Sequence, residues 1–194
     1  MTTLTNYSLD QFAADMAELV KSEPEQARLF ERGAAYLERF IRNPNAISDE
    51  FKRPVGRGKR PNHGSYALYR CQGLFISSVV WGPGDYIKPH DHQTWGLIGI
   101  LENAIQETRY RRVDDRARED YAKIEKDRAM LMKPGETSLL VPGVDEIHRL
   151  DNFSDRPTVE IHVYGKDLVG LPRYSYDPET CVVTPFKSDK FDNC

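Results

Sequence analysis

The chain has 194 residues, of which 39% are hydrophobic and 29% are charged, and its 27 basic and 30 acidic residues give a formal net charge of −3. This composition is that of one globular domain and excludes collagen-like fibres, while three widely spaced cysteines exclude a disulfide scaffold. No apolar run is long enough to cross a bilayer, no basic cluster indicates nucleic acid as a partner, and no secretory signal opens the sequence. We therefore expect a cytoplasmic enzyme or small-molecule binder with reduced thiols.

The N-terminal residues 1–50 predict two amphipathic helices. Ser8 and Gln11 have the spacing of a capping box, and apolar residues follow at steps of three and four. A second apolar stripe stops at an Asn-Pro pair. Because the two helices cannot bury both stripes alone, we expect them to pack on a β-structure formed by residues 51–194, within a single structural domain; the alternative is that they bind a partner protein.

Residues 52–64 are basic and rich in glycine and proline. They could form a loop over an anionic site, although a solvated linker is the more common reason for such a composition. From residue 65 the pattern changes to short β-branched or aromatic runs separated by turn residues. Closely spaced strands without helices between them are typical of an antiparallel sandwich or barrel. The predicted strands are 65–71, 74–81, 96–110, 129–133, 138–141, 159–164 and 181–184, with the charged stretch 109–128 as an exposed excursion.

Three of the five histidines could meet at one point. His90 and His92 are two residues apart, and in an extended strand such side chains point to the same face, roughly 6.5–7 Å apart. His148 lies at the start of a later predicted strand and could supply a third nitrogen. The alternative is that these histidines are hydrogen-bonded core or surface residues. Three neutral imidazoles would leave coordination positions open, as catalytic sites do, but they do not choose between zinc and iron(II).

Residues 159–164 alternate strictly between polar and apolar. Glu160, His162 and Tyr164 share one face of the predicted strand, and the other face carries only β-branched residues. From this segment alone, the polar face could be the outer one. If it faces a barrel interior instead, the three side chains must hydrogen-bond, because buried polar groups without partners are costly. Arg173 follows Tyr164 by nine residues.

The chain carries parts of the two sequence motifs of cupins, which place metal ligands on adjacent strands of a small barrel. The histidine pair follows Gly84, and the third histidine follows a Pro-Gly pair. The glutamate of the first motif would fall at Gly96 or Leu97, and neither side chain can bind a metal. The sequence therefore resembles a cupin whose ligands are all histidines.

The closer resemblance is to the thiol dioxygenases, a cupin family that includes cysteine dioxygenase and bacterial 3-mercaptopropionate dioxygenase. It covers roughly residues 65–185 and is carried by His-Asp-His-x-Thr-Trp-Gly at 90–96, by residues 148–152 and by His162-x-Tyr164. The first motif and the arginine nine residues after the tyrosine are more similar to the 3-mercaptopropionate branch than to the mammalian cysteine enzyme.

This resemblance implies a mainly β fold, a cupin (double-stranded β-helix or jelly-roll) barrel with the two N-terminal helices packed outside. It implies that His90, His92 and His148 are iron(II) ligands. It also implies that Tyr164 and His162 are outer-sphere groups and that Arg173 binds the substrate carboxylate. The implied reaction adds both atoms of O2 to the sulfur of a small carboxylate-bearing thiol, such as 3-mercaptopropionate, and yields the sulfinate, in a monomer or homodimer.

Two departures from the family pattern bear on these implications. No cysteine follows the histidine pair, so we predict no cysteine–tyrosine crosslink. Glu160 stands where the bacterial pattern has serine; as a candidate catalytic residue it could hold His162 and raise its basicity, or attract a cationic group on a different substrate. The alternatives are therefore a cysteine or other aminothiol dioxygenase, another metal-dependent cupin enzyme such as an isomerase or a dioxygenase that cleaves carbon–carbon bonds, and a non-catalytic binding module.

Overall fold

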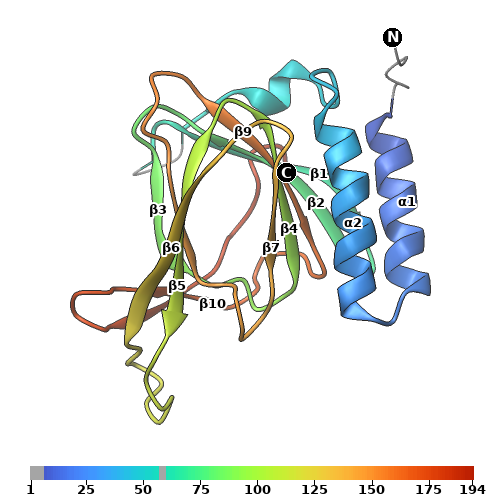
Figure 1. Ribbon diagram of the computed structural model, residues 1–194. Helices are drawn as coiled ribbons and strands as arrows, with labels where there is room; N and C mark the ends of the chain where they lie inside the picture. Colours follow the sequence, from blue (N-terminus) through green and yellow to red (C-terminus); the bar gives the residue numbers. More distant parts are fainter. Residues whose placement is uncertain (1–6, 57–59) are drawn as a thin grey trace.

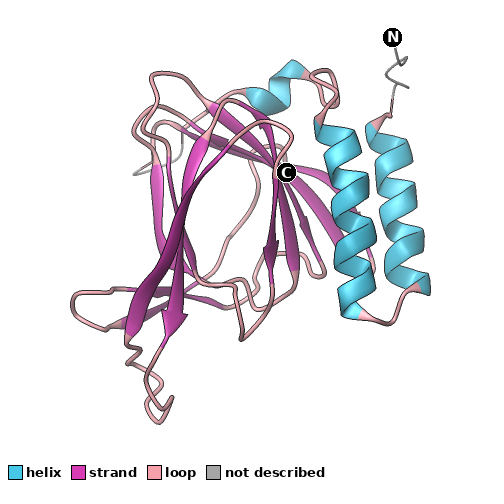
Figure 2. Ribbon diagram, in the orientation of Figure 1, coloured by secondary structure: helices cyan, strands magenta, loops and turns pink. Residues whose placement is uncertain are grey.

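The structure, a computed structural model, describes residues 7–56 and 60–194, so that Arg57 and Lys59 of the basic segment lie outside the described residues. Two helices lie side by side on the outside of a β-barrel (Figures 1 and 2). A short 3-10 helix, Asp49–Lys52, follows them. None of the helices described is long and apolar enough to span a membrane.

The strands form two antiparallel sheets. One has the order β1-β2-β9-β4-β7 and the other the order β11-β10-β3-β8-β5-β6. The first sheet consists of β1 (His63–Cys71), β2 (Leu74–Trp81), β9 (Thr158–Tyr164), β4 (Gly96–Glu102) and β7 (Thr137–Leu140). The second consists of β11 (Val183–Phe186), β10 (Arg173–Tyr176), β3 (Tyr86–His90), β8 (His148–Asp151), β5 (Ile105–Arg112) and β6 (Ile124–Met132).

Strands β2 to β9 alone give the orders β2-β9-β4-β7 and β3-β8-β5-β6. Along the chain, the strands therefore cross repeatedly from one sheet to the other through Greek-key connections. This strand order is that of a jelly roll. The expected fold, a mainly β barrel of the cupin type with two helices outside, is confirmed.

Helices α1 (Leu9–Ser22) and α2 (Gln26–Ile41) cover the outer face of the first sheet. The predicted capping box is present at the start of α1, where the Ser8 hydroxyl accepts from the backbone of Gln11. The apolar side chains of β9 belong to the same buried cluster as the helix residues. Because successive strand residues point to opposite faces, the polar side chains of β9 must face the barrel interior. The alternative of an outward polar face is therefore wrong.

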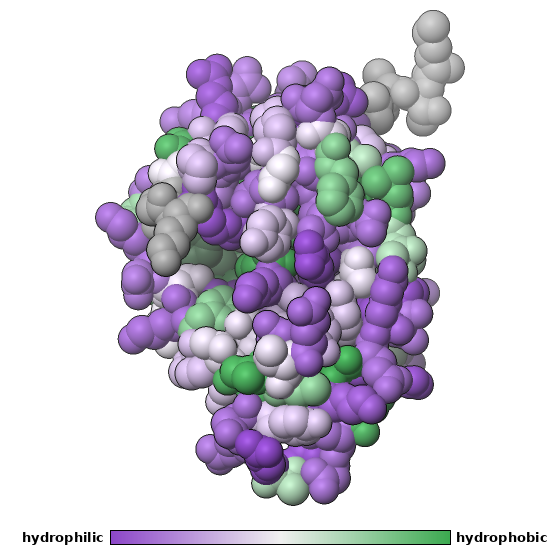
Figure 3. Space-filling view, turned by 90° about the vertical axis from the view of Figure 1, so that its left-hand side faces the viewer, coloured by the Kyte–Doolittle hydropathy of each residue, from purple (hydrophilic) through white to green (hydrophobic). Residues whose placement is uncertain are grey.

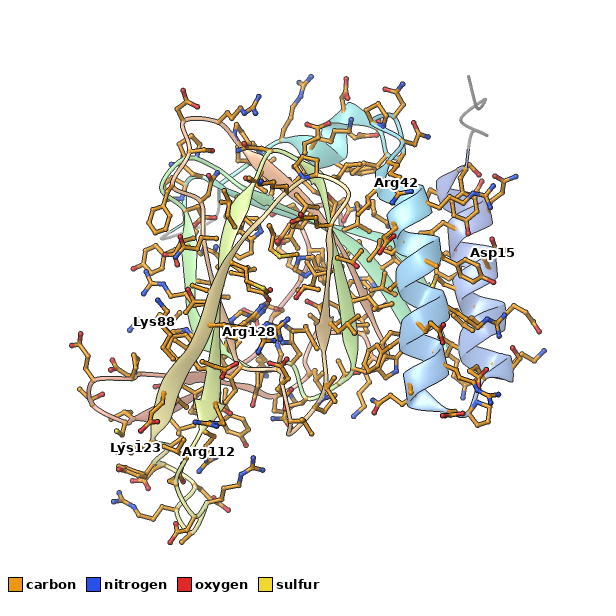
Figure 4. The ribbon with its side chains drawn as sticks, viewed as in Figure 1. Asp15, Arg42, Lys88, Arg112, Lys123 and Arg128 are labelled. Carbon is orange, nitrogen blue, oxygen red and sulfur yellow. The ribbon has the colours of Figure 1, made fainter. Side chains whose placement is uncertain are left out.

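The strand boundaries differ from the sequence expectation at several places. The expected strand 96–110 is two strands, because the chain turns at Asn103, which has a φ of 60°. The charged stretch 109–128 is mostly exposed, as expected, but it forms a hairpin in which β5 pairs with β6 as far as Arg112 and Ile124. Figure 4 shows Arg112 and Lys123 at the projecting end of this hairpin. Cross-strand pairing, which no local pattern reports, extends both strands.

Candidate active site

Three histidines converge inside the barrel. His90 is the last residue of β3 and pairs with His148, the first residue of β8, while His92 lies two residues beyond the end of β3. One ligand atom from each of the three residues lies within 4.8 Å of the other two. The ring centroids are 4.7, 4.8 and 5.0 Å apart, and all three side chains are buried. The structure thus brings together the three residues that the sequence singled out.

His92 is held in place although it lies outside the strand. The chain turns directly after it, where Gln93 has a φ of 54°. Asp91 fixes this turn: its backbone N–H donates to the carbonyl of Tyr174 at 3.0 Å, and its carboxylate accepts from the backbone of Tyr174 at 2.8 Å and from the hydroxyl of Tyr176 at 2.7 Å. The expected extended pair is therefore a strand end followed by a turn that β10 anchors.

The three imidazoles are suited to bind a metal ion. Burial lowers the pKa of His90 and His92 well below the usual value, and neighbouring histidines lower it further; burial also lowers the pKa of His148. Neutral rings keep a lone pair. His90 Nδ1–H donates to the carbonyl of Lys88 at 2.9 Å, and His148 Nε2 is buried without a hydrogen-bond partner. A set of imidazole nitrogens of this kind fits a divalent transition metal.

Glu107, which the sequence analysis missed, lies directly behind His148. The ring Nδ1–H of His148 donates to its carboxylate at 2.7 Å, and the Ser138 hydroxyl donates to the other oxygen at 2.7 Å. Arg109 Nε lies 2.9 Å from the same carboxylate. Burial raises the pKa of Glu107, but the hydrogen bond from His148 and the charge of Arg109 outweigh it and lower the pKa to about 2. An ionised carboxylate thus orients this imidazole, as is common at metal sites.

A sequence signal for Glu107 existed. Glu107 and Arg109 are two residues apart in the predicted strand 96–110, so they share one face of it. Two opposite charges on one strand face are usually solvent-exposed, so this pair does not by itself indicate a buried site. Both side chains are only 1% exposed, because β5 lies between β8 and β6 and its inner face is covered by β7 residues such as Ser138.

The polar face of β9 forms a chain of hydrogen bonds. The carboxylate of Glu160 accepts from Trp81 Nε1 at 2.6 Å and lies 2.9 Å from His162 Nε2. His162 Nδ1 lies 2.6 Å from the hydroxyl of Tyr164, whose ring stacks on His92 at 5.4 Å between centroids. In a neutral His162, Nε2 carries the proton and Nδ1 accepts from the tyrosine. Burial raises the pKa of Tyr164, so the tyrosine keeps its proton.

Glu160 lies behind His162 rather than in front of it. It is fully buried, one carboxylate oxygen has no hydrogen-bond partner, and it is not among the described residues that line the cavity. This placement argues against direct attraction of a cationic substrate group by Glu160. It is compatible with a role through His162.

A cavity of about 730 Å³ connects these groups, and His90, His92, His162, Tyr164 and Arg173 all line it. The space-filling view of the side opposite the helices shows a recess in a mainly hydrophilic surface (Figure 3). This volume lies within the roughly 300–1,000 Å³ of typical ligand pockets. The cavity can therefore admit a small molecule to the histidine cluster, of which it exposes His90 and His92.

Arg173 is a buried cation at this cavity. Its side chain is 5% exposed, Nη2 donates to the Ser188 hydroxyl at 2.6 Å, and the guanidinium carbon lies 4.5 Å from the ring centre of Phe186. Nε has no hydrogen-bond partner, and no carboxylate among the described residues forms an ion pair with it. Burial lowers the pKa of Arg173. A buried guanidinium without a counter-ion is suited to bind an anion.

Comparison with known proteins finds no family model that matches the chain. Among solved structures, oxalate oxidase in complex with glycolate has a TM-score of 0.44 at 14% identity, covering 63% of this chain and 62% of its own. A double-stranded β-helix protein from Klebsiella pneumoniae has a TM-score of 0.44 at 15% identity, covering 74% and 98%. A sugar phosphate isomerase from a cupin superfamily, from Silicibacter pomeroyi, has a TM-score of 0.43 at 14% identity, covering 66% of this chain and 79% of its own. The fold is identified by its strand order rather than by these distant similarities.

Proposed function

We propose that the protein is an iron(II)-dependent thiol dioxygenase that converts a small carboxylate-bearing thiol, such as 3-mercaptopropionate, and O2 into the sulfinate. The observation that carries this proposal is the juxtaposition of a three-histidine cluster, of which His90 and His92 line the cavity, with a buried arginine without a counter-ion in the same cavity. The histidines favour a metal with open positions, and the arginine favours an anionic substrate. The sequence resemblance to the thiol dioxygenases supports iron and sulfur as the reacting partners.

His90, His92 and His148 would hold the metal ion. Iron(II) would bind the substrate sulfur as a thiolate and supply the redox chemistry that O2 requires. Glu107 fixes the orientation of His148 through Nδ1 and thereby leaves Nε2 for the metal.

Arg173 would bind the substrate carboxylate in a charge-assisted pair. Its donors are held by Ser188 on one side and its flat face lies against Phe186, so that few orientations remain for the guanidinium. A thiol acid bound in this way would present its sulfur in a fixed register to the histidines. Such positioning is a large part of what an enzyme contributes to a reaction between two bound molecules.

Tyr164 would serve as an outer-sphere hydrogen-bonding group beside the reacting groups, and His162 and Glu160 as its support. The tyrosine hydroxyl is within hydrogen-bond distance of His162, which Glu160 holds from behind. Glu160 is thus a positioning residue rather than a group that touches substrate. Its carboxylate would keep the His162 ring in one orientation and one tautomer.

The test is oxygen consumption by protein that has been loaded with iron(II) under anaerobic conditions, against 3-mercaptopropionate, cysteine, cysteamine and bulkier thiols. We expect one sulfinate per O2 consumed, detected by mass spectrometry, and fastest turnover with a carboxylate-bearing thiol. Oxygen uptake without sulfinate, or no uptake with any thiol, would refute the proposal. A preference for cysteamine would favour an aminothiol dioxygenase instead.

A further inference from the structure

The strand register orders the cavity wall of the second sheet into three levels. Ser175 of β10 pairs with His90, so Arg173 lies two residues further along, toward His92. On the other side of His90, Ile87 of β3 pairs with Leu150 of β8. Arg173, which lies level with His92, then the His90–His148 pair and then the Ile87–Leu150 pair therefore follow one another along the strands.

The first sheet shows the same order. Tyr164, which stacks on His92, marks the level of the arginine, and His162 marks the middle. The cavity wall then continues along β2 to Val79 and Trp81, the latter paired with the first residue of β9. In both sheets the order is therefore a cationic end, which includes His92, then the level of the His90–His148 pair, and then a different end.

One wall of this other end is apolar, beside a polar rim in which Arg60 and His63 both pair with Asp85. Trp81 and Leu150 belong to one buried hydrophobic cluster, and Val79 and Ile87 pack against it. All four side chains line the cavity. Carbon surface that lines a cavity gains free energy when an apolar group replaces water, in proportion to the area covered.

We propose that the substrate is a 3-mercapto acid whose sulfur-bearing carbon carries an apolar alkyl or aryl substituent. This inference rests on the proposed function, because it assumes that the substrate sulfur binds at the histidines and that the substrate carboxylate binds to Arg173. A three-carbon acid bound in this way extends from the histidines to the arginine only and leaves the apolar end unfilled. A substituent on the sulfur-bearing carbon points from the middle level toward Val79, Trp81, Ile87 and Leu150.

The experiment compares 3-mercaptopropionate with 3-mercapto-3-phenylpropanoate on the iron-loaded enzyme. Dissociation constants are measured by anaerobic calorimetry, and O2 is then admitted and the sulfinate quantified. We expect the phenyl compound to bind roughly tenfold or more tightly, because burial of a ring in the apolar end adds to the same two polar contacts. Val79→Phe fills this end and should reverse the preference, while 3-mercaptopropionate keeps its affinity within about threefold.

The control is Val182→Phe, the same substitution at a half-exposed position that does not line the cavity, and it should retain the wild-type preference. Equal affinity for the two thiols, or a preference that Val79→Phe leaves unchanged, would overturn the inference. So would a Val79→Phe variant that changes only the KM for O2, which would assign the apolar end to oxygen. If the preference is present but no sulfinate forms from either thiol, the proposed reaction fails and the ligand class stands.

Discussion

Arg173 is the side chain on which substrate selection depends most directly. Removal of the guanidinium in Arg173→Ala should raise the KM for a carboxylate-bearing thiol strongly, with a loss of about 2–5 kcal/mol, because a buried charge pair is broken. Steady-state oxygen consumption measures this effect. A thiol without a carboxylate, such as cysteamine, provides the control and should be affected far less; a similar loss for both thiols would contradict the assignment.

Glu107 offers a test of metal binding that does not depend on turnover. Glu107→Gln keeps the shape of the side chain but removes the charge behind His148, so we expect iron(II) affinity to fall about 10–100-fold. Competition with a chromogenic chelator under anaerobic conditions measures this affinity. Glu125→Gln on the exposed surface of β6 is the matched control. Unchanged iron affinity in Glu107→Gln would mean that the carboxylate only supports Arg109.

Glu160 is expected to act on the rate rather than on substrate affinity. Glu160→Gln retains a group that can contact Trp81 and His162 but removes the negative charge, so kcat should fall about 10–100-fold with little change in KM. Steady-state kinetics at equal iron content separates the two parameters. A rise in KM at constant kcat would instead indicate that the residue contacts substrate.

At the scale of single residues, local sequence identified the groups with distinctive chemistry but not their support. A histidine pair at i, i+2 is unusual enough to be singled out, whereas the role of Arg173 followed from the family resemblance. Glu107 and Arg109 are not unusual in this way, since charged residues are mostly exposed. Their burial depends on Ser138 and His148, which approach from strands 30 to 40 residues away in the chain, and local sequence does not report that approach.

At the scale of elements, Gly96 shows how β4 and β9 make room for the site. A Cβ at this position would lie 2.9 Å from two ring carbons of Tyr164 and 2.9 Å from Leu140. At Gly96, one of the two positions where the glutamate of the first cupin motif would fall, the side-chain space is therefore occupied by the tyrosine ring of the neighbouring strand. A side chain at position 96 and the Tyr164 ring would need the same space, so the absence of a carboxylate at Gly96 allows Tyr164 to lie at the cavity.

Gly96→Ala should therefore displace Tyr164 and reduce both stability and activity. We expect a loss of about 1–3 kcal/mol in the free energy of unfolding, since a rigid ring must move. Chemical denaturation and oxygen consumption measure the two effects. Gly33→Ala in α2 is the comparison, because its added methyl meets the mobile end of Leu97 and alanine favours a helix; an equal loss in both variants would contradict this account.

The accuracy of the element prediction followed the strength of the local pattern. Helix periodicity and the capping box at Ser8 located α1, the apolar and β-branched run at 74–81 located β2, and the strict alternation at 159–164 located β9. The four-residue strand β10 has no such pattern. It exists because Asp91 and β3 pair with it, so its position becomes apparent only when the barrel closes.

At the scale of the whole molecule, metal binding should stabilise the fold. The ligands come from β3, the turn after it and β8, so an ion that binds only the folded state would link the two ends of a loop of more than 50 residues. Iron(II) at 100 times its dissociation constant should add about 2.7 kcal/mol to the free energy of unfolding. Anaerobic thermal denaturation with and without metal measures this.

The control for this prediction compares alanine variants of two histidines that line the same cavity, His92 and His63. His92→Ala should lose both the stabilisation by metal and one equivalent of retained iron. His63→Ala should keep both, because His63 pairs with Asp85 and is not part of the three-histidine group. Retention of one equivalent of iron by His92→Ala would exclude the proposed triad.

The fold class was predictable from the sequence because it depends on the number and spacing of strands, whereas the pairing order was not. Short alternating runs separated by turns are compatible with a sandwich or several barrels. The jelly-roll order arises from contacts between strands distant in the chain, such as β2 with β9 and β3 with β8. The family resemblance supplied this information, which local patterns lacked.

Strand β9 is buried on both faces, with the helices on one side and the cavity on the other. Alternate positions of this strand thus have separate tasks. Val159, Ile161 and Val163 pack with the helical layer, and Glu160 and His162 form the hydrogen-bonded chain on the cavity side. Within this seven-residue strand, substitutions on the cavity face would therefore change the reaction, and substitutions on the helix face would change the stability of the fold.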